Sequence, residues 1–135
     1  MTLLSQIIAE STARLAAEGI GTPRLEVSYL LQHVLGCSAT ELLLSADRPL
    51  DPARQATFLV LLSRRLQHEP LAYILQQVGF YGQMLRVTPD VLIPLPESEL
   101  LVDLALQAYA RFPLGERLVI DVGTGSGALA IALQK

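Results

Sequence analysis

Three alternating glycines follow a short apolar run near the end of the printed sequence. The segment reads Leu118-Val-Ile-Asp-Val-Gly-Thr-Gly-Ser-Gly127, and a new helical pattern begins at Ala128. Glycine lets a backbone approach a ligand closely, and the amides at the start of a helix favour negative charge. We therefore predict a loop that cradles a nucleotide-like cofactor. The alternative is a glycine-rich turn that serves only compact folding.

Two classes of cofactor are compatible with this loop. Gly123, Gly125 and Ala128 match the fingerprint of dinucleotide-binding folds, in which a further acid lies about 20 residues onward. Asp121, two residues before the first glycine, instead resembles the first motif of S-adenosylmethionine-dependent methyltransferases. In those enzymes the acid would face the cationic methionine end of the cofactor. A third role for Asp121, a cap for the loop's own amides, fits either cofactor.

A second set of motifs lies upstream of the glycine loop. Its blocks are Glu69-Pro-Leu-Ala-Tyr-Ile-Leu75, Gly79-Phe-Tyr-Gly82 and Val91-Leu-Ile-Pro-Leu-Pro-Glu-Ser-Glu-Leu100. In order and spacing, these blocks and the loop resemble the protein-(glutamine-N5) methyltransferases of peptide chain release factors, the HemK or PrmC family. The resemblance covers the whole chain. It departs at Gln76, Gly79 and Leu95, where the family usually has glycine, glutamate and arginine.

The resemblance implies a fold, an activity and a set of contacts. The fold is a small helical domain joined by a hairpin to a Rossmann-like methyltransferase domain. The activity is methyl transfer from S-adenosyl-L-methionine to the glutamine of the Gly-Gly-Gln motif in release factors, which are the implied protein partners. The implied cofactor contacts are Asp121, Gly123, Thr124, Gly125 and Gly127, and weaker candidates at the edge of the active site are Pro94, Pro96, Glu97 and Ser98. For Glu97 and Glu99, a solvated first helical turn is an equal interpretation.

Part of the family pattern is not among these 135 residues. The Asn-Pro-Pro-Tyr motif, which in the family holds the substrate glutamine, does not occur, and neither does the acid that would bind the cofactor's ribose. We therefore expect no catalytic residue within this chain and no methylation by these residues alone. The alternatives are a non-catalytic binding module for release factors or ribosome-associated partners, a ribosomal-protein glutamine methyltransferase, and a nicotinamide-dependent enzyme. Asp121 and the upstream blocks disfavour the last of these.

Apolar spacing predicts the scaffold that positions these motifs. Four helices are expected over residues 2–18, 22–35, 38–45 and 51–69, with start signals at Thr22, Ser38 and Asp51. They form an all-α N-terminal helical bundle, and we assign residues 1–72 to a substrate-recognition domain.

The pattern changes beyond the bundle. Residues 78–87 predict a hairpin around Gly82, residues 91–96 are too rich in proline for a central strand, and residues 73–96 are assigned to a hairpin and connector. A helix is expected over 97–111 and a central parallel strand over 118–122, which is apolar on both faces. Residues 97–135 are therefore assigned to the incomplete start of an α/β Rossmann-like methyltransferase domain. Without an encoded parallel neighbour, that strand should be disordered or pair with a second copy, a possible self-association.

Composition limits the class of partner and the compartment. Hydrophobic residues make up 51% and the net charge is -3, which favours a protein or small-molecule partner over naked nucleic acid. The lone Cys37 indicates a reducing setting, and no apolar run approaches the roughly 18 residues of a membrane span, so we expect a cytoplasmic protein. His33 and His68 lack partners at ligand spacing, so no metal is expected. The fourth helix carries three basic residues, Arg54, Arg64 and Arg65. They predict either a basic face that binds a ribosome-associated partner or a helix face that is only solvated.

Overall fold

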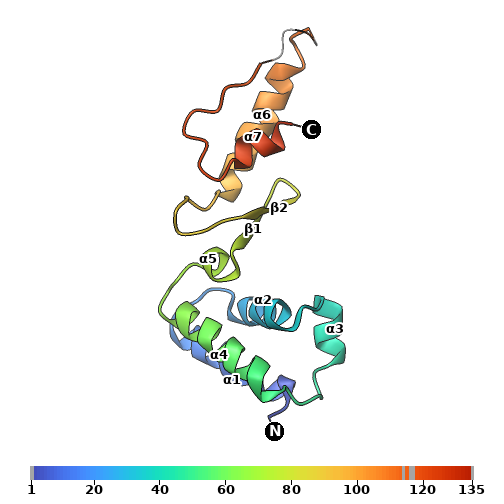
Figure 1. Cartoon of the computed structure of the whole chain (residues 1–135), viewed down its shortest axis with the longest axis vertical. Helices are drawn as coiled ribbons and strands as arrows, with labels where there is room; N and C mark the ends of the chain where they lie inside the picture. Colours follow the sequence, from blue (N-terminus) through green and yellow to red (C-terminus); the bar gives the residue numbers. More distant parts are fainter. Residues whose placement is uncertain (1, 114, 116–117, 135) are drawn as a thin grey trace. The chain divides into compact units, whose positions relative to one another are not determined.

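The computed structural model describes residues 2–113, 115 and 118–134. The chain forms two compact units, one within residues 1–75 and one within residues 76–135. Figure 1 colours the first unit blue to green and the second yellow to red. In the part of the chain that the structure describes, no helix is both long enough and apolar enough to cross a membrane.

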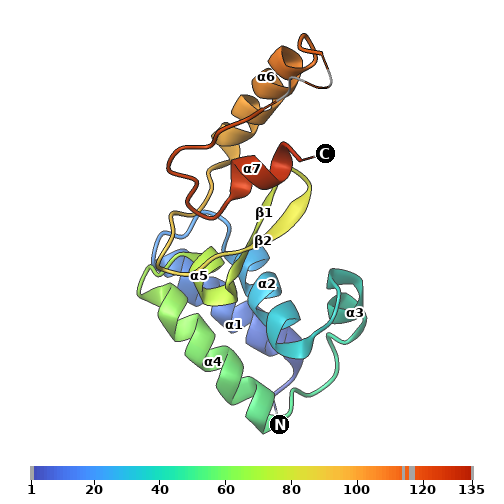
Figure 2. The same ribbon diagram turned by 45° about the horizontal axis from the view of Figure 1, so that its top comes forward.

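The first unit is built from helices, as the apolar spacing predicted. They are α1 (Leu4–Ala17), α2 (Pro23–Leu35), α3 (Ala39–Leu44), α4 (Pro52–Leu66) and α5 (Leu71–Leu75), all labelled in Figure 2. Two details differ from the prediction. α4 ends at Leu66 and not at Glu69, because His68 takes a left-handed backbone conformation with φ of 62°. The short α5, which was not predicted, begins after Pro70, whose carbonyl accepts hydrogen bonds from the amides of Tyr73 and Ile74.

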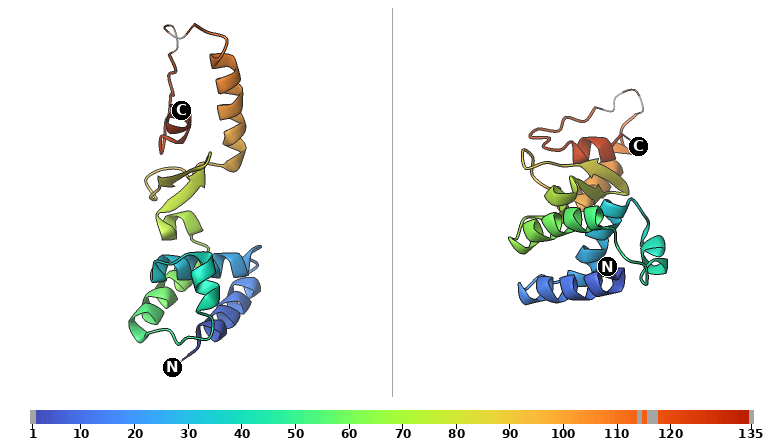
Figure 3. Two further views of the ribbon diagram at one scale, coloured as in Figure 1. Left: turned by 90° about the vertical axis from the view of Figure 1, so that its right-hand side faces the viewer. Right: turned by 60° about the horizontal axis from the view of Figure 1, so that its bottom comes forward.

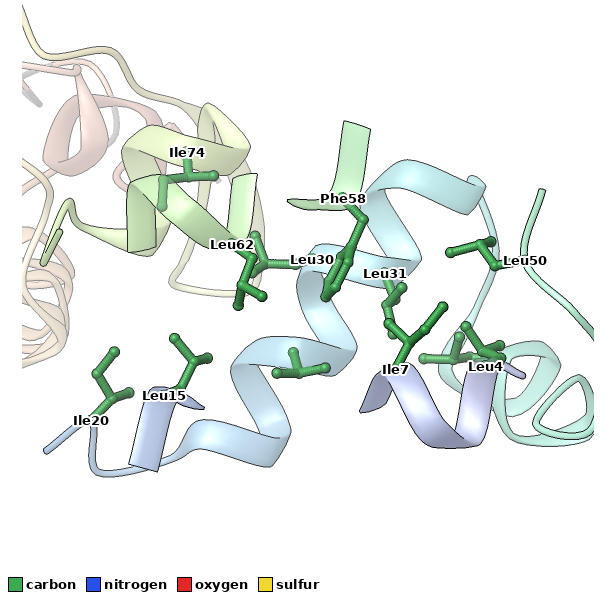
Figure 4. Close-up of a cluster of buried hydrophobic side chains, with 12 residues drawn as sticks. Leu4, Ile7, Leu15, Ile20, Leu30, Leu31, Leu50, Phe58, Leu62 and Ile74 are labelled. Atoms are coloured by element: carbon green, nitrogen blue, oxygen red, sulfur yellow. The ribbon is translucent and has the colours of Figure 1, made fainter. Parts of the chain in front are cut away.

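One apolar cluster holds the first unit together. Its largest fully buried side chains are Leu15, Val27, Leu30, Leu31, Phe58 and Leu62. Figure 4 shows the ring of Phe58, from α4, beside Leu30 and Leu31 of α2. The cluster lies where α1, α2 and α4 meet, so these three helices form the core and the shorter elements flank it.

The helix ends show which start signals work. Ser38 and Glu41 form the predicted capping box, with the Glu41 amide donating to Ser38 Oγ at 3.3 Å and the Ser38 amide donating to Glu41 Oε2 at 2.8 Å. Asp51 accepts hydrogen bonds from the amides of Ala53 and Arg54 at 3.0 and 3.2 Å. Thr22 is the N-cap residue of α2, as predicted, but its side chain makes no cap hydrogen bond. Its backbone, at ψ of 56°, lies outside the extended region from which a cap side chain reaches the helix amides.

The basic residues of α4 do not form a free cationic face. Arg65 Nε lies 2.5 Å from Glu26 Oε2, Arg64 Nη2 lies 2.5 Å from Glu69 Oε1, and Arg54 Nε lies 3.3 Å from Asp51 Oδ2. Each guanidinium is therefore paired with a carboxylate of the same unit.

The second unit opens with the predicted hairpin. Strands β1 (Gln77–Phe80) and β2 (Gln83–Arg86) pair antiparallel, with Phe80 opposite Gln83. Both residues of the two-residue turn have positive φ, 48° at Tyr81 and 72° at Gly82, as a type I′ turn requires. The connector after β2 has no strand, as predicted, and runs to a 3-10 turn η1 (Pro96–Ser98) and helix α6 (Glu99–Tyr109). Figure 3 shows the hairpin, α6 and α7 (Ala128–Ala132) from two further directions.

The predicted central strand at 118–122 is not a strand in this structure, and that prediction was wrong. Among the described residues the one sheet is the β1–β2 pair, so residues 118–122 have no ladder partner. A strand needs hydrogen bonds from a neighbour, and an apolar pattern does not supply them. The side chains are correspondingly open to solvent, with Leu118 at 80%, Ile120 at 77% and Val122 at 90% exposed.

Candidate functional site

The glycine loop is closed by its own hydrogen bonds. The Gly127 amide donates to the Thr124 carbonyl at 2.9 Å, and Thr124 Oγ1 donates to Asp121 Oδ2 at 3.0 Å. Gly123, Gly125 and Gly127 all have positive φ, at 74°, 55° and 80°. Residues that carry a side chain rarely adopt this left-handed backbone conformation, so glycine is required for the shape of the loop. The predicted helix after the loop is present as α7.

Tight packing does not explain the first two glycines. A Cβ atom built at Gly123 or Gly125 would meet nothing within 4 Å, and one at Gly127 would meet only the Ile131 side chain at 3.6 Å. The purely compact turn, the alternative to a binding loop, would be expected to place other atoms against these positions. Instead, the backbone at Gly123 and Gly125 faces open space that a ligand can occupy.

A pocket of about 180 Å³ joins this loop to the upstream motifs. The loop contributes Gly123, Thr124 and Gly125, and the connector region contributes Pro94 and Ser98. The remaining lining is mostly apolar: Phe80, Leu92, Ile93, Leu95, Ser126, Ala128 and Leu129. Five of the nine predicted site residues therefore meet at one pocket, although they come from segments that are 25 or more positions apart in the sequence.

The other four predicted site residues lie elsewhere. Pro96 and Glu97 are exposed and do not line this pocket, which agrees with a solvated first turn for Glu97. Gly127 serves as the N-cap of α7. Asp121 is partly buried and lines a different hollow with Val119 and Ala130, among others. Its carboxylate accepts the Thr124 hydroxyl, so it stabilises the loop through a side chain and not through the amides.

A group that the sequence did not reveal fixes two walls of the pocket. The Tyr81 amide donates to Glu99 Oε1 at 2.7 Å, and the Tyr81 hydroxyl donates to Asp103 Oδ1 at 2.7 Å. We call these three residues the Tyr81 clamp; it ties the hairpin turn to α6. Phe80 precedes Tyr81 and Ser98 precedes Glu99, and both line the pocket, so the clamp holds these two walls in place.

The clamp changes one expectation from the sequence and shifts the pKa of one side chain. Glu99 is not part of a merely solvated turn, since its carboxylate accepts a backbone hydrogen bond. The hydrogen bond to Asp103 raises the pKa of the Tyr81 hydroxyl, and the nearby negative charges act in the same direction. The i, i+4 spacing of Glu99 and Asp103 signals one helix face, but nothing in the sequence identifies Tyr81 as the partner of that face.

The size and lining of the pocket limit what it can hold. Small-molecule pockets usually measure roughly 300–1,000 Å³, so a pocket of about 180 Å³ has room for only part of a ligand of that size. Apolar side chains together with an open glycine backbone suit a ligand that has both a flat apolar portion and polar groups. In the described part of the chain, no group of three His, Cys, Asp or Glu side chains is placed to hold a metal ion.

Comparison with known proteins identifies the family. The family model described as the PrmC N-terminal domain matches residues 6–75. The chain belongs to this family. The resemblance found in the sequence motifs is thereby confirmed.

Curated relatives extend the similarity beyond the first unit. A release factor glutamine methyltransferase of Bordetella pertussis is 43% identical over 98% of this chain and 45% of its own length. One of Burkholderia pseudomallei is 46% identical over 81% of this chain and 38% of its own length. A bifunctional methyltransferase of Rickettsia conorii is 34% identical over 96% of this chain and 29% of its own length. The chain thus spans less than half the length of these relatives.

Proposed function

We propose that this chain is part of an enzyme that uses S-adenosyl-L-methionine to methylate the N5 nitrogen of the glutamine in the Gly-Gly-Gln motif of release factors. The observation that carries the proposal is the pocket in which the glycine loop meets Pro94 and Ser98 of the upstream motif. Two motifs that contribute to one pocket favour a shared ligand over two independent turns. The names of the relatives from Bordetella pertussis and Burkholderia pseudomallei support the substrate.

The loop is the proposed holder of the cofactor. Gly123 and Gly125 would offer open backbone with Thr124 between them, and Gly127 would shape the loop as the N-cap of α7. Bound S-adenosyl-L-methionine would supply an electrophilic methyl group. The carboxylate of Asp121 would favour the cationic end of the cofactor, and its bond to Thr124 would keep the loop in shape.

The pocket walls have a separate proposed role. Phe80 and Leu129 would exclude water from the apolar part of the ligand, while Pro94, Pro96, Glu97 and Ser98 would form the edge that faces the protein substrate. An amide nitrogen is a poor nucleophile, so the reaction depends on positioning it and on polar groups that accept its protons. We place no catalytic residue of that kind within these 135 residues.

The two units receive different parts of this function. Residues 1–72 are the proposed substrate-recognition domain, residues 73–96 the hairpin and connector, and residues 97–135 the start of a Rossmann-like domain. The exposed aliphatic side chains of 118–122 support the last assignment, because such a surface is expected to be covered by further elements or by a second copy. A cytoplasmic location fits a release-factor substrate. A ribosomal protein as substrate remains the alternative.

Calorimetric titration of the chain with S-adenosyl-L-methionine and with NADH tests the cofactor. We expect binding of the former and not of the latter, and the opposite ranking would favour the nicotinamide alternative. Ser98→Phe fills the pocket at a position whose side chain makes no cap bond, so it should weaken binding by about tenfold or more. The control is Ser63→Phe, at an exposed position of α4. Equal affinities for the two variants would remove this pocket as the cofactor site.

The substrate is tested by mass spectrometry on a release factor incubated with the chain and S-adenosyl-L-methionine. We expect retention of the release factor in a pull-down but no added methyl group. A methylated glutamine would contradict the expectation that these residues lack the catalytic groups. If the chain does not retain the release factor, the result would count against residues 1–72 as a recognition domain.

A further inference from the structure

A groove in the first unit lies apart from the glycine-loop pocket. It has a volume of about 430 Å³ and is lined by three helices, α1, α2 and α3, which are labelled in Figure 2. Apolar lining comes from Ile8, Leu42 and Leu43, and polar groups come from Thr12, Arg24 and Ser28. None of these residues belongs to the cofactor pocket described above.

The positive charge of Arg24 lies at a position where the helix dipole disfavours it. This residue is the second of α2, after Pro23, and the amide end of a helix favours negative side chains and disfavours cations. Arg24 has no carboxylate partner among the residues that the structure describes, as is also true of Arg14 and Arg48, so what sets Arg24 apart is its position in the first turn of α2. The stability of the helix therefore gives no reason for arginine at this position.

Two further side chains of the groove are also unfavourable in the isolated unit. Thr12 Oγ1 is buried and has no hydrogen-bond partner among the described residues. Leu43 is 69% exposed, so its side chain gains little from burial. An unpaired cation, an unsatisfied hydroxyl and an exposed leucine thus share one groove. A bound segment that supplies a carboxylate and an apolar side chain would satisfy the arginine and the leucine, while the buried Thr12 hydroxyl lies out of its reach.

We propose that this groove docks an acidic, apolar segment of the protein substrate. A carboxylate of the segment pairs with Arg24, and a neighbouring aliphatic or aromatic side chain packs on Leu42 and Leu43. The inference rests on the proposed function for the identity of that substrate, a release factor. Because the whole chain carries a net charge of -3, an acidic segment is not attracted by the overall charge. Its attraction depends on the local Arg24 guanidinium and should weaken with salt.

The test measures the affinity of the full chain for the purified release factor of Bordetella pertussis by surface plasmon resonance. Arg24→Glu should weaken binding by about tenfold or more, because it replaces attraction by repulsion. Its melting temperature should be unchanged or higher, since glutamate suits the start of α2. The matched control is Arg14→Glu, which changes the same charge on the face of α1 opposite the one that carries Ile8 and Thr12.

A second pair of variants tests the apolar contact. Leu43→Gln should weaken binding, while Leu44→Gln should not, although Leu44 is the next residue and is even more exposed at 80%. If the wild-type chain binds and all four variants bind alike, the groove is not the docking site and the proposed function stands. If the wild-type chain binds S-adenosyl-L-methionine but no release factor, both the partner and the docking proposal are overturned.

Discussion

The ion pair between Glu26 and Arg65 should contribute far more to stability than its neighbour between Glu69 and Arg64. Arg65 Nε and Nη2 lie 2.5 and 3.3 Å from the two Glu26 carboxylate oxygens, and the two side chains are only 16% and 13% exposed. The pair joins α2 to α4 across 39 positions in the sequence. Glu26→Gln keeps the shape of the side chain but leaves the largely buried guanidinium without its counter-charge.

The expected loss follows from this burial. Removing one partner of a buried ion pair costs about 3–5 kcal/mol. The remaining exposure, and the 3.1 Å bond from Arg65 Nη1 to the Glu69 carbonyl, place Glu26→Gln at the lower end, about 3 kcal/mol. With an m-value of about 1.5 kcal/mol/M, the urea midpoint should fall by about 2 M.

Glu69→Gln is the matched comparison, because it breaks the ion pair of the adjacent arginine on the same helix. Arg64 and Glu69 are 40% and 29% exposed, and a partly solvated pair contributes about 1 kcal/mol or less. Urea unfolding followed by circular dichroism measures both variants, since the affected unit is helical. Equal losses of stability in the two variants would refute the reasoning that burial decides the strength of these pairs.

Three other predictions follow from single contacts. The first unit should lose stability as the pH falls below 4.5, the ordinary pKa of a glutamate, because hydrogen bonds from Ser38 lower the pKa of Glu41 and those from Arg64 lower the pKa of Glu69. A carboxylate whose pKa is lower in the folded than in the unfolded state stabilises the fold above the unfolded-state pKa, and this stabilisation is lost in acid. Melting temperatures measured against pH check this, and a melting temperature that does not fall below pH 4.5 would contradict it. The hydrogen bond to Asp103 raises the pKa of the Tyr81 hydroxyl above its ordinary value of 10.0. The contribution of this hydrogen bond to the stability of the second unit should therefore be lost as the pH rises past that value. The difference in phenolate absorbance between wild type and Tyr81→Phe isolates this group, and a midpoint at or below 10.0 would argue against the clamp. Phe58→Ala should cost about 3–5 kcal/mol in urea unfolding, because the ring is fully buried, whereas Leu59→Ala, at a position 44% exposed, should cost much less.

Features that depend on neighbours in the chain could be predicted from the sequence. The Ser38 capping box and the Asp51 cap involve residues two or three positions apart, so their hydrogen bonds follow from residue type and spacing. The turn at Tyr81 and Gly82 joins two short strands whose pairing is set by the turn itself. Thr22 shows the limit of this reasoning, since a correct cap residue without the extended backbone makes no cap bond.

Features that depend on distant segments required the tertiary structure. No local pattern indicated that Arg65 would reach Glu26, or that Tyr81 would bind Asp103 across 22 positions. The strand predicted from the apolar run at 118–122 was wrong for the same reason, because a strand exists only where another strand supplies hydrogen bonds.

The sequence by itself determined the family, the helical spacing of the first unit and the glycine loop, because motifs and short-range hydrogen bonds depend on residues that are close together in the chain. The tertiary structure decided which of those residues meet. It brought Pro94 and Ser98 to Gly123 and Gly125, left Pro96 and Glu97 in solvent, and set Phe80 as a wall through the Tyr81 clamp. Packing between distant segments sets these distances, and no local pattern encodes them.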